Sequence, residues 1–238
     1  MIKNIVILVI NFFDFFYKNK IINFLKKKKI NIEYFIDVGA HHGETIELFS
    51  RNFKIKKIYA FEPSPINFKN LKKKYQNKKI FFDLKLENFA LGNSNKNIEF
   101  YQLNESSSST AKKLNFESNY LLRKLKLLNL NQKNYLQSFN VKQIKLSKYY
   151  TDKNINKVDF LKIDTEGSEF EILRGLDEKI KGVNYIFFEH HYDDMIKKDY
   201  KFSDINQLLR KNNFKLIFKS KMPFRRTFEY IFKNLSIN

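Results

Sequence analysis

Apolar and polar positions follow a regular order along the chain from residue 34 onward. Short apolar runs of strand length are followed by longer segments in which apolar residues recur at helical spacing. This order is typical of βαβ units, which build a mainly parallel sheet with helices on its faces. Strands are predicted over residues 33–40, 57–63, 158–164, 183–191 and 214–220, with a strand running into a loop over 79–93 and a strand or hairpin arm over 97–103. Helices are predicted over residues 44–53, 64–75, 119–136, 168–176 and 202–212. The pattern therefore predicts an α/β fold.

Residues 104–140 interrupt this order. The stretch 104–113 is polar, and residues 119–136 are helical by their apolar spacing. The alternation of strands and helices then resumes at residue 141. We interpret the interruption as an insertion beside the functional site rather than as a linker between domains.

The first 33 residues are predicted to form a helical extension, apolar at first and basic at residues 26–29. Asn11 and Asp14 interrupt its apolar run, which falls short of the ~20 apolar residues that a membrane span requires. Two interpretations stay open. The extension packs on the main domain, residues 34–238, or residues 1–29 contact the inner face of the membrane as an amphipathic, basic segment.

The formal net charge of +20 comes from 45 Lys and Arg against 25 Asp and Glu. Such a charge attracts polyanions. The lysines are spread along the whole chain, however, so we do not expect nucleic acid as the partner. The chain has no cysteine, which excludes disulfides, thiolate metal sites and a cysteine nucleophile and is compatible with a cytoplasmic location.

The first candidate site is the pattern D-x-G-x-x-x-G, formed by Asp37, Gly39 and Gly43 between a predicted strand and a predicted helix. Glycine at the strand exit lets the backbone turn tightly and approach a ligand. His41 stands where the dinucleotide fingerprint G-x-G-x-x-G has the glycine that admits a pyrophosphate. A cofactor without phosphates therefore fits better than NAD or FAD, and S-adenosylmethionine is the candidate.

Two further acids follow predicted strands. Glu62 lies about 20 residues beyond the first turn, where nucleotide-binding α/β folds place an acid that accepts the ribose hydroxyls. Asp164 ends an apolar strand, where a carboxylate requires a partner or a role. Because parallel strands end at one edge of a sheet, these acids and Asp37 are predicted to meet. Ser168 and Glu169 are interpreted as residues that favour the start of the next helix.

The chain resembles the FkbM family of S-adenosylmethionine-dependent methyltransferases over roughly residues 34–220, in the stretches FIDVGAHHGET, FEPSP, ENFALGN, DFLKIDTEGSEFEILRG and IFFEHH. The resemblance implies a Rossmann-like class I methyltransferase fold, with a mostly parallel seven-stranded sheet in the order 3-2-1-4-5-7-6. It also implies O-methylation of a hydroxyl group on a glycan, a sugar or a related small molecule. The implied cofactor contacts are Asp37, Gly39 and Gly43 at the methionine side, Glu62 at the ribose, and Asn88, Phe89 and Ala90 near the adenine. Asp164 is implied to lie beside the transferred methyl group.

All four histidines occur in two pairs, His41–His42 and His190–His191. Histidine is the commonest general base because its pKa lies near working pH. We hypothesise that His190 or His191 removes the acceptor's proton, oriented by Asp164 or Glu189, while His41 contacts the cofactor or the acceptor. Two alternatives stay open. In the first, all four histidines are polar turn residues without a chemical role. In the second, one of them joins Asp164, Glu189 and Asp193 around a divalent ion.

Two other functions remain compatible with the sequence. The positive charge and the aromatic residues interleaved with lysines suit an RNA methyltransferase. A non-catalytic, membrane-associated protein could retain the same fold without the chemistry. The sequence identifies neither the acceptor nor the oligomeric state.

Overall fold

The computed structural model describes residues 19–103, 109–127, 136–223 and 225–237. Three parts of the expectations lie outside the described residues. They are the apolar residues 1–18 of the predicted extension, residues 104–108 of the polar stretch, and residues 128–135 of the predicted helix.

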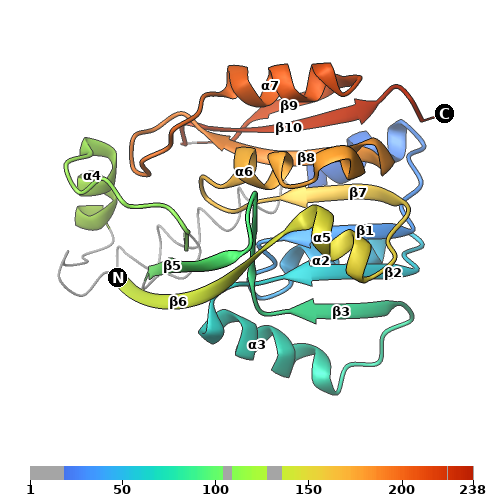
Figure 1. Ribbon diagram of the computed structural model, residues 1–238, viewed down its shortest axis with the longest axis horizontal. Coiled ribbons are helices and arrows are strands. Elements are labelled where there is room, and N and C mark those ends of the chain that lie inside the picture. The colour runs from blue at the N-terminus through green and yellow to red at the C-terminus, as the bar shows by residue number, and fades with distance from the viewer. Residues whose placement is uncertain (1–18, 104–108, 128–135, 224, 238) are drawn as a thin grey trace.

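A seven-stranded sheet forms the centre of the molecule (Figure 1). Its strands are β1 (Tyr34–Val38), β2 (Lys57–Phe61), β3 (Asp83–Glu87), β7 (Val158–Ile163), β8 (Val183–His191), β9 (Phe214–Lys221) and β10 (Thr227–Asn234). They are ordered β3-β2-β1-β7-β8-β10-β9, and all pairs are parallel except the two that β10 makes with its neighbours. With its strands numbered in chain order, the sheet reads 3-2-1-4-5-7-6, which confirms the expected fold.

Helices cover both faces of this sheet (Figure 1). They are α2 (Glu44–Asn52), α3 (Pro65–Gln76), α5 (Leu146–Asp152), α6 (Glu169–Arg174) and α7 (Phe202–Lys211), with a short 3-10 helix, η2 (Asp177–Gly182), before β8. Apolar residues of α5, α6 and α7 pack with one face of the central strands, and those of α2 and α3 pack with the other. Ser64 caps α3 as its oxygen accepts the Asn67 N–H at 3.1 Å, and Pro65 occupies the first turn. The apolar cores on the two faces fix the central sheet. Because β1, β2, β7 and β8 are parallel, their carboxyl ends lie at the same edge of it.

Residues 90–145 contain a second, three-stranded sheet and a helix, of which only the helix and the first residues of one strand lie in the segment 104–140 that was expected as an insertion. The sheet has the order β4-β6-β5, from β4 (Ala90–Gly92), β5 (Lys96–Leu103) and β6 (Leu136–Lys145), and the helix is α4 (Asn119–Leu127). The helix predicted over 119–136 was therefore too long, because Leu136 already pairs with Leu103 in the β5–β6 ladder. Apolar spacing along the chain does not reveal such a pairing between distant segments.

The described part of the N-terminal extension packs on the main domain. Residues 19–27 are helical, and Ile21, Ile22 and Leu25 are buried in the core beneath α2 and α3. The ring of Phe24 lies 4.7 Å from that of Phe218 in β9. No helix among residues 19–237, where the structure describes them, is long and apolar enough to cross a membrane.

Candidate functional site

The turn after β1 is held against both neighbouring strands. Gly39 has φ +80°, and a Cβ atom there would lie 1.9 Å from the carbonyl oxygen of Asp164, so only glycine fits. The N–H groups of Gly39 and Ala40 donate to the carbonyl of Phe61 at the end of β2, at 3.0 and 2.9 Å. The glycine turn therefore closes against β2 and β7 together.

A buried lysine, which our sequence analysis did not select, links the acids of β1 and β7. The ammonium nitrogen of Lys162 lies 2.9 Å from Asp37 Oδ1 and 3.4 Å from Asp164 Oδ2, and it donates to the Gly39 carbonyl at 2.9 Å. Burial disfavours charge on Lys162, but the two carboxylates outweigh it and raise the pKa of this lysine. Burial also raises the pKa of Asp37, against the effect of Lys162. The signal in the sequence was one lysine inside the apolar run VDFLKI.

Glu62 lies at the end of β2, where its carboxylate binds the turns on both sides. Its two oxygens accept the backbone N–H groups of His41 at 2.8 Å and of Ser64 at 2.9 Å. Its side chain is buried, and burial raises its pKa. The Asn88 amide donates to the Glu62 carbonyl oxygen at 2.8 Å and to that of Pro63 at 3.1 Å. The structure thus brings together the residues expected at the ribose and at the adenine.

Phe89 and Ala90 continue this edge of the sheet. The ring of Phe89 packs on those of Phe61 and Tyr149, with centroids 5.5 and 5.9 Å apart, and Ala90 is buried at the start of β4. The partly exposed Phe89 ring is therefore fixed by aromatic packing rather than by hydrogen bonds.

Glu169 is the first residue of α6 and Ser168 its N-cap, as expected, but the Glu169 side chain has a further role. Its Oε1 accepts the N–H groups of Thr165 and Gly167 and the Thr165 hydroxyl, at 3.3, 3.0 and 3.1 Å, and its Oε2 accepts the Tyr200 hydroxyl. The side chain is 1% exposed. Glu169 therefore supports the turn after β7 from inside. This turn places Glu166 at the surface of the site in a left-handed conformation, with φ +53°.

His191 lies in a ring of carboxylates at the end of β8. Its Nε2 is 3.1 Å from Glu166 and 3.7 Å from Glu189, while its Nδ1 is 3.7 Å from Asp193 and 3.0 Å from the Thr227 hydroxyl. Burial opposes the charged imidazole, but these carboxylates outweigh it and raise the pKa of His191 to about 10. At neutral pH His191 therefore carries a proton.

Glu189 faces the same side of β8 as His191. Burial and the negative charge of Asp164 raise its pKa to about 8, although the charge on His191 opposes the shift. Glu189 therefore changes its protonation state near neutral pH.

His190 points to the opposite face of β8. It is not part of the acid group, by which we mean His191 and the carboxylates of Glu166, Glu189 and Asp193 around it. It lies among the rings of Tyr192, Tyr200 and Phe202, with centroids 4.8, 5.9 and 5.9 Å away. Burial lowers its pKa to about 3, so that it stays neutral. The period of two along a strand sends adjacent residues to opposite faces, so only one histidine of this pair can join the acids.

The insertion lies against the loops that follow β7 and β8. The Thr110 hydroxyl donates to the Glu166 carbonyl at 2.6 Å, and the Ser118 hydroxyl donates to Asp194 at 2.5 Å. Leu121 and Leu125 of α4 pack in a small core with Met195 and Ile196 of the loop after β8. The described part of the insertion thus lies beside the acid group.

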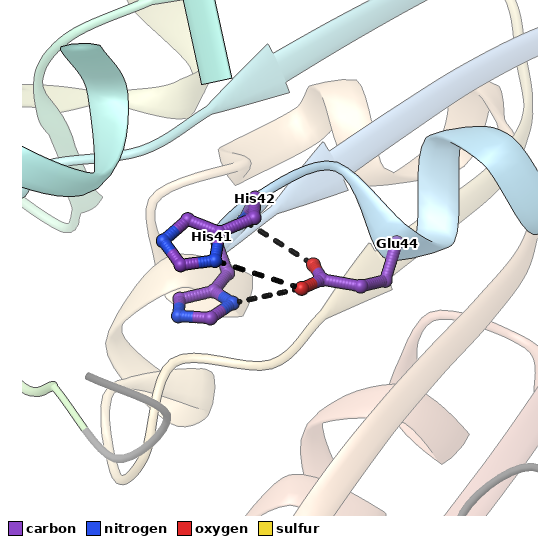
Figure 2. Close-up of side chains that lie close together, drawn as sticks. All are labelled: His41, His42 and Glu44. Atoms are coloured by element: carbon purple, nitrogen blue, oxygen red, sulfur yellow. Dashed lines mark hydrogen bonds and ion pairs between the residues drawn. The ribbon is translucent and has the colours of Figure 1, made fainter. Parts of the chain in front are cut away.

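His41 and His42 lie with Glu44 at the start of α2 (Figure 2). Burial and the neighbouring His41 lower the pKa of His42. These three are the only described residues whose ligand atoms lie close enough together to hold a metal ion. Asp164, Glu189 and Asp193, considered as ligands from the sequence, do not form such a group in that part of the chain.

The model of the methyltransferase FkbM domain matches residues 37–216. The chain belongs to the FkbM methyltransferase family. A search of curated proteins finds no match. Solved structures with the same fold include M. capricolum TrmK with S-adenosylhomocysteine, at 13% identity over 92% of this chain and 68% of that one, with a TM-score of 0.50. Another is magnesium protoporphyrin IX methyltransferase from Synechocystis PCC 6803 with S-adenosylhomocysteine, at 9% identity over 94% and 83% of the two chains, with a TM-score of 0.50.

Membership in the FkbM family makes this protein a methyltransferase. The matched region begins at Asp37 and includes every candidate residue described above. Its sheet order is that of class I methyltransferases, whose sites lie at the carboxyl ends of the strands. The edge of the sheet that carries Asp37, Glu62 and Asp164 is therefore the candidate active site.

Proposed function

We propose that the protein is an S-adenosylmethionine-dependent O-methyltransferase that acts on a hydroxyl group of a glycan, a sugar or a related small molecule. The observation that carries this proposal is the set of carboxylates at the ends of three adjacent parallel strands. Asp37 lies near the end of β1, Glu62 follows β2 and Asp164 follows β7, around a turn that accepts only glycine at position 39.

The residues of this edge suit the cofactor. Asp37 Oδ2 is buried with no hydrogen-bond partner among the described residues, and Glu62 accepts one hydrogen bond at each oxygen, where a carboxylate oxygen can accept two. The ammonium and ribose hydroxyl groups of S-adenosylmethionine are donors that match this unused capacity. We place Asp37, Gly39, His41 and Gly43 at its methionine end, and Asn88, Phe89 and Ala90 at its adenine. The bound cofactor supplies an electrophilic methyl group.

The chain's own residues must align the acceptor and remove its proton. Asp164 lies between the cofactor edge and the acid group, linked to the former through Lys162. Glu189 is the best-placed proton acceptor, because its raised pKa matches a general base near neutral pH. His191 stays protonated beside it and stabilises the carboxylate form. His190 is directed away and takes no part in this arrangement.

The acceptor is expected between the acid group and the insertion. Glu166 and Glu189 lie on this side, where α4 packs on the loop after β8. Carboxylates are suitable acceptors for the hydroxyl groups of a sugar. They repel the phosphates of RNA, which favours a carbohydrate acceptor over a nucleic acid despite the net charge of +20.

The acceptor class can be tested with S-adenosylmethionine labelled in its methyl group. The purified protein is incubated with separate polysaccharide, glycolipid and RNA fractions. Label that enters a carbohydrate fraction, resists RNase and is recovered as an O-methyl sugar after hydrolysis is the expected result. Label that RNase releases from the RNA fraction would show that the acceptor class is wrong.

A further inference from the structure

The turn between β1 and α2 carries His41, which we place beside the cofactor, together with His42 and Glu44, which have no role in the proposed methyl transfer. We propose that His41, His42 and Glu44 bind a divalent transition-metal ion such as Zn²⁺. Figure 2 shows both imidazole rings beside the same carboxylate. Their Nδ1 atoms lie 3.2 Å (His41) and 3.9 Å (His42) from Glu44 Oε1, and one ligand atom from each residue lies within 4.8 Å of the others.

These distances suit a tetrahedral ion. Zinc binds imidazole nitrogen and carboxylate oxygen at about 2.0–2.2 Å, which separates two ligand atoms of one tetrahedron by roughly 3.3 Å. The pair formed by His41 and Glu44 already has this separation. The pair formed by His42 and Glu44 needs to close by only about half an ångström, which a small rotation of the His42 side chain supplies.

The backbone holds the three side chains in place. Oε2 of Glu44 accepts the His42 N–H at 3.2 Å, and the Lys74 ammonium donates to the His42 carbonyl at 2.9 Å. The two imidazole rings are stacked with their centroids 3.8 Å apart. His41 is in the left-handed region, with φ +49°. A non-glycine residue in this region costs energy, and such residues gather at functional sites.

The ligand types determine the class of ion. Two imidazoles and one carboxylate are also the protein ligands of one class of catalytic zinc sites, which keep a fourth position for water or substrate. Magnesium and calcium prefer oxygen ligands alone, so the two histidines favour zinc, cobalt, nickel or copper. The three side chains are 28%, 37% and 44% exposed, so an ion can reach them from solvent and keep a water ligand.

The experiment uses the full chain without a histidine tag and without cofactor. Co²⁺ is titrated while the visible absorption of tetrahedral cobalt is recorded, and Zn²⁺ is then added to displace it. Calorimetry measures the Zn²⁺ affinity of the wild type, His42→Gln and Glu44→Gln. Glu178→Gln in η2, at the opposite edge of the sheet, is the matched control because it removes one exposed carboxylate elsewhere.

We expect one Zn²⁺ per chain, with an affinity at least tenfold weaker in His42→Gln and in Glu44→Gln and unchanged in Glu178→Gln. The proposal is overturned if the wild type shows no tetrahedral cobalt spectrum, or if both site variants bind Zn²⁺ as tightly as the wild type. Circular dichroism confirms that each variant is folded. The cofactor proposal is tested separately by S-adenosylhomocysteine binding in EDTA, so failure of one does not imply failure of the other.

Discussion

The ammonium nitrogen of Lys162 lies 2.9 Å from a carboxylate oxygen of Asp37, and both side chains are buried at the centre of the sheet. The pair connects β7 to β1, the two strands whose ends form the middle of the candidate site. A buried charge is tolerated only when it is paired and hydrogen-bonded. The Gly39 carbonyl and Asp164 complete the surroundings of the ammonium group.

Lys162→Met is expected to lower the free energy of unfolding by about 3–5 kcal/mol, because it leaves Asp37 buried beside an apolar side chain. Urea denaturation measures the change. The double variant Asp37→Asn/Lys162→Met removes both charges and should recover most of the loss. A loss below about 1 kcal/mol for Lys162→Met, which is typical of an exposed ion pair, would contradict this account of the pair.

Gly39→Ala should prevent the turn from closing. The new Cβ would lie 1.9 Å from the Asp164 carbonyl oxygen, and alanine disfavours φ +80°. We expect the variant to lose at least ~2 kcal/mol of stability and its affinity for S-adenosylhomocysteine. Gly182→Ala is the control, because its Cβ would lie 3.1 Å from the Asn156 carbonyl at the other edge. Equal losses of stability and of affinity in the two variants would show that the turn at position 39 does not require glycine.

The neighbouring histidines of β8 are expected to differ in charge. Because the pKa of His191 is raised to about 10 and that of His190 is lowered to about 3, the imidazole of His191 should be protonated at pH 8 and that of His190 neutral at pH 5. NMR of ring C–H signals, assigned with His190→Gln and His191→Gln, measures both. A His191 signal that titrates near pH 6.5, the ordinary value for histidine, would contradict the carboxylate ring.

The raised pKa of His191 also affects stability. The folded state holds a proton that the unfolded state releases above about pH 6.5, so this stabilisation is complete below that pH. It is lost as the pH rises toward about 10. The raised pKa of Glu189 also contributes stability that is lost as the pH rises, over a lower pH range that ends at about pH 8. Unfolding free energy should therefore fall between pH 6.5 and 10, by about 1.4 kcal/mol per pH unit for each proton.

Methyl transfer should depend on Glu189. With a pKa near 8, turnover is expected to rise as the pH increases through this value, because the carboxylate is the form that accepts a proton. Glu189→Gln should lower turnover by about 10²- to 10⁴-fold and remove this rise, with little change in affinity for S-adenosylhomocysteine. Glu178→Gln, far from the site, serves as the control. A variant that keeps full turnover would assign the base to another group.

The sequence was most informative where a local requirement determined the structure. Apolar runs predicted six of the seven strands of the central sheet but not β10, and the glycine pattern predicted the turn at Gly39. Ser64 and Pro65 marked the start of α3. In each case the residue type is required by the backbone at that position, so the neighbouring residues are enough to recognise it.

Interactions between distant segments were less visible. The pairing of β5 with β6 depends on residues about forty positions apart along the chain and has no local periodicity. Lys162 was missed because a lysine in an apolar strand becomes meaningful only when its two carboxylate partners are known. Glu169 begins α6, as interpreted, but its contact with the distant Tyr200 hydroxyl could not be read from the neighbouring residues.

The account's central claim is that the edge with Asp37, Glu62 and Asp164 binds S-adenosylmethionine. Calorimetry with S-adenosylhomocysteine, on the wild type and on Glu62→Gln, tests it most directly. The wild type should bind one molecule per chain, and the glutamine variant should bind at least about tenfold more weakly, because it loses an acceptor for the ribose hydroxyls. A folded wild type that does not bind the ligand, or equal affinity in the two proteins, would contradict the claim.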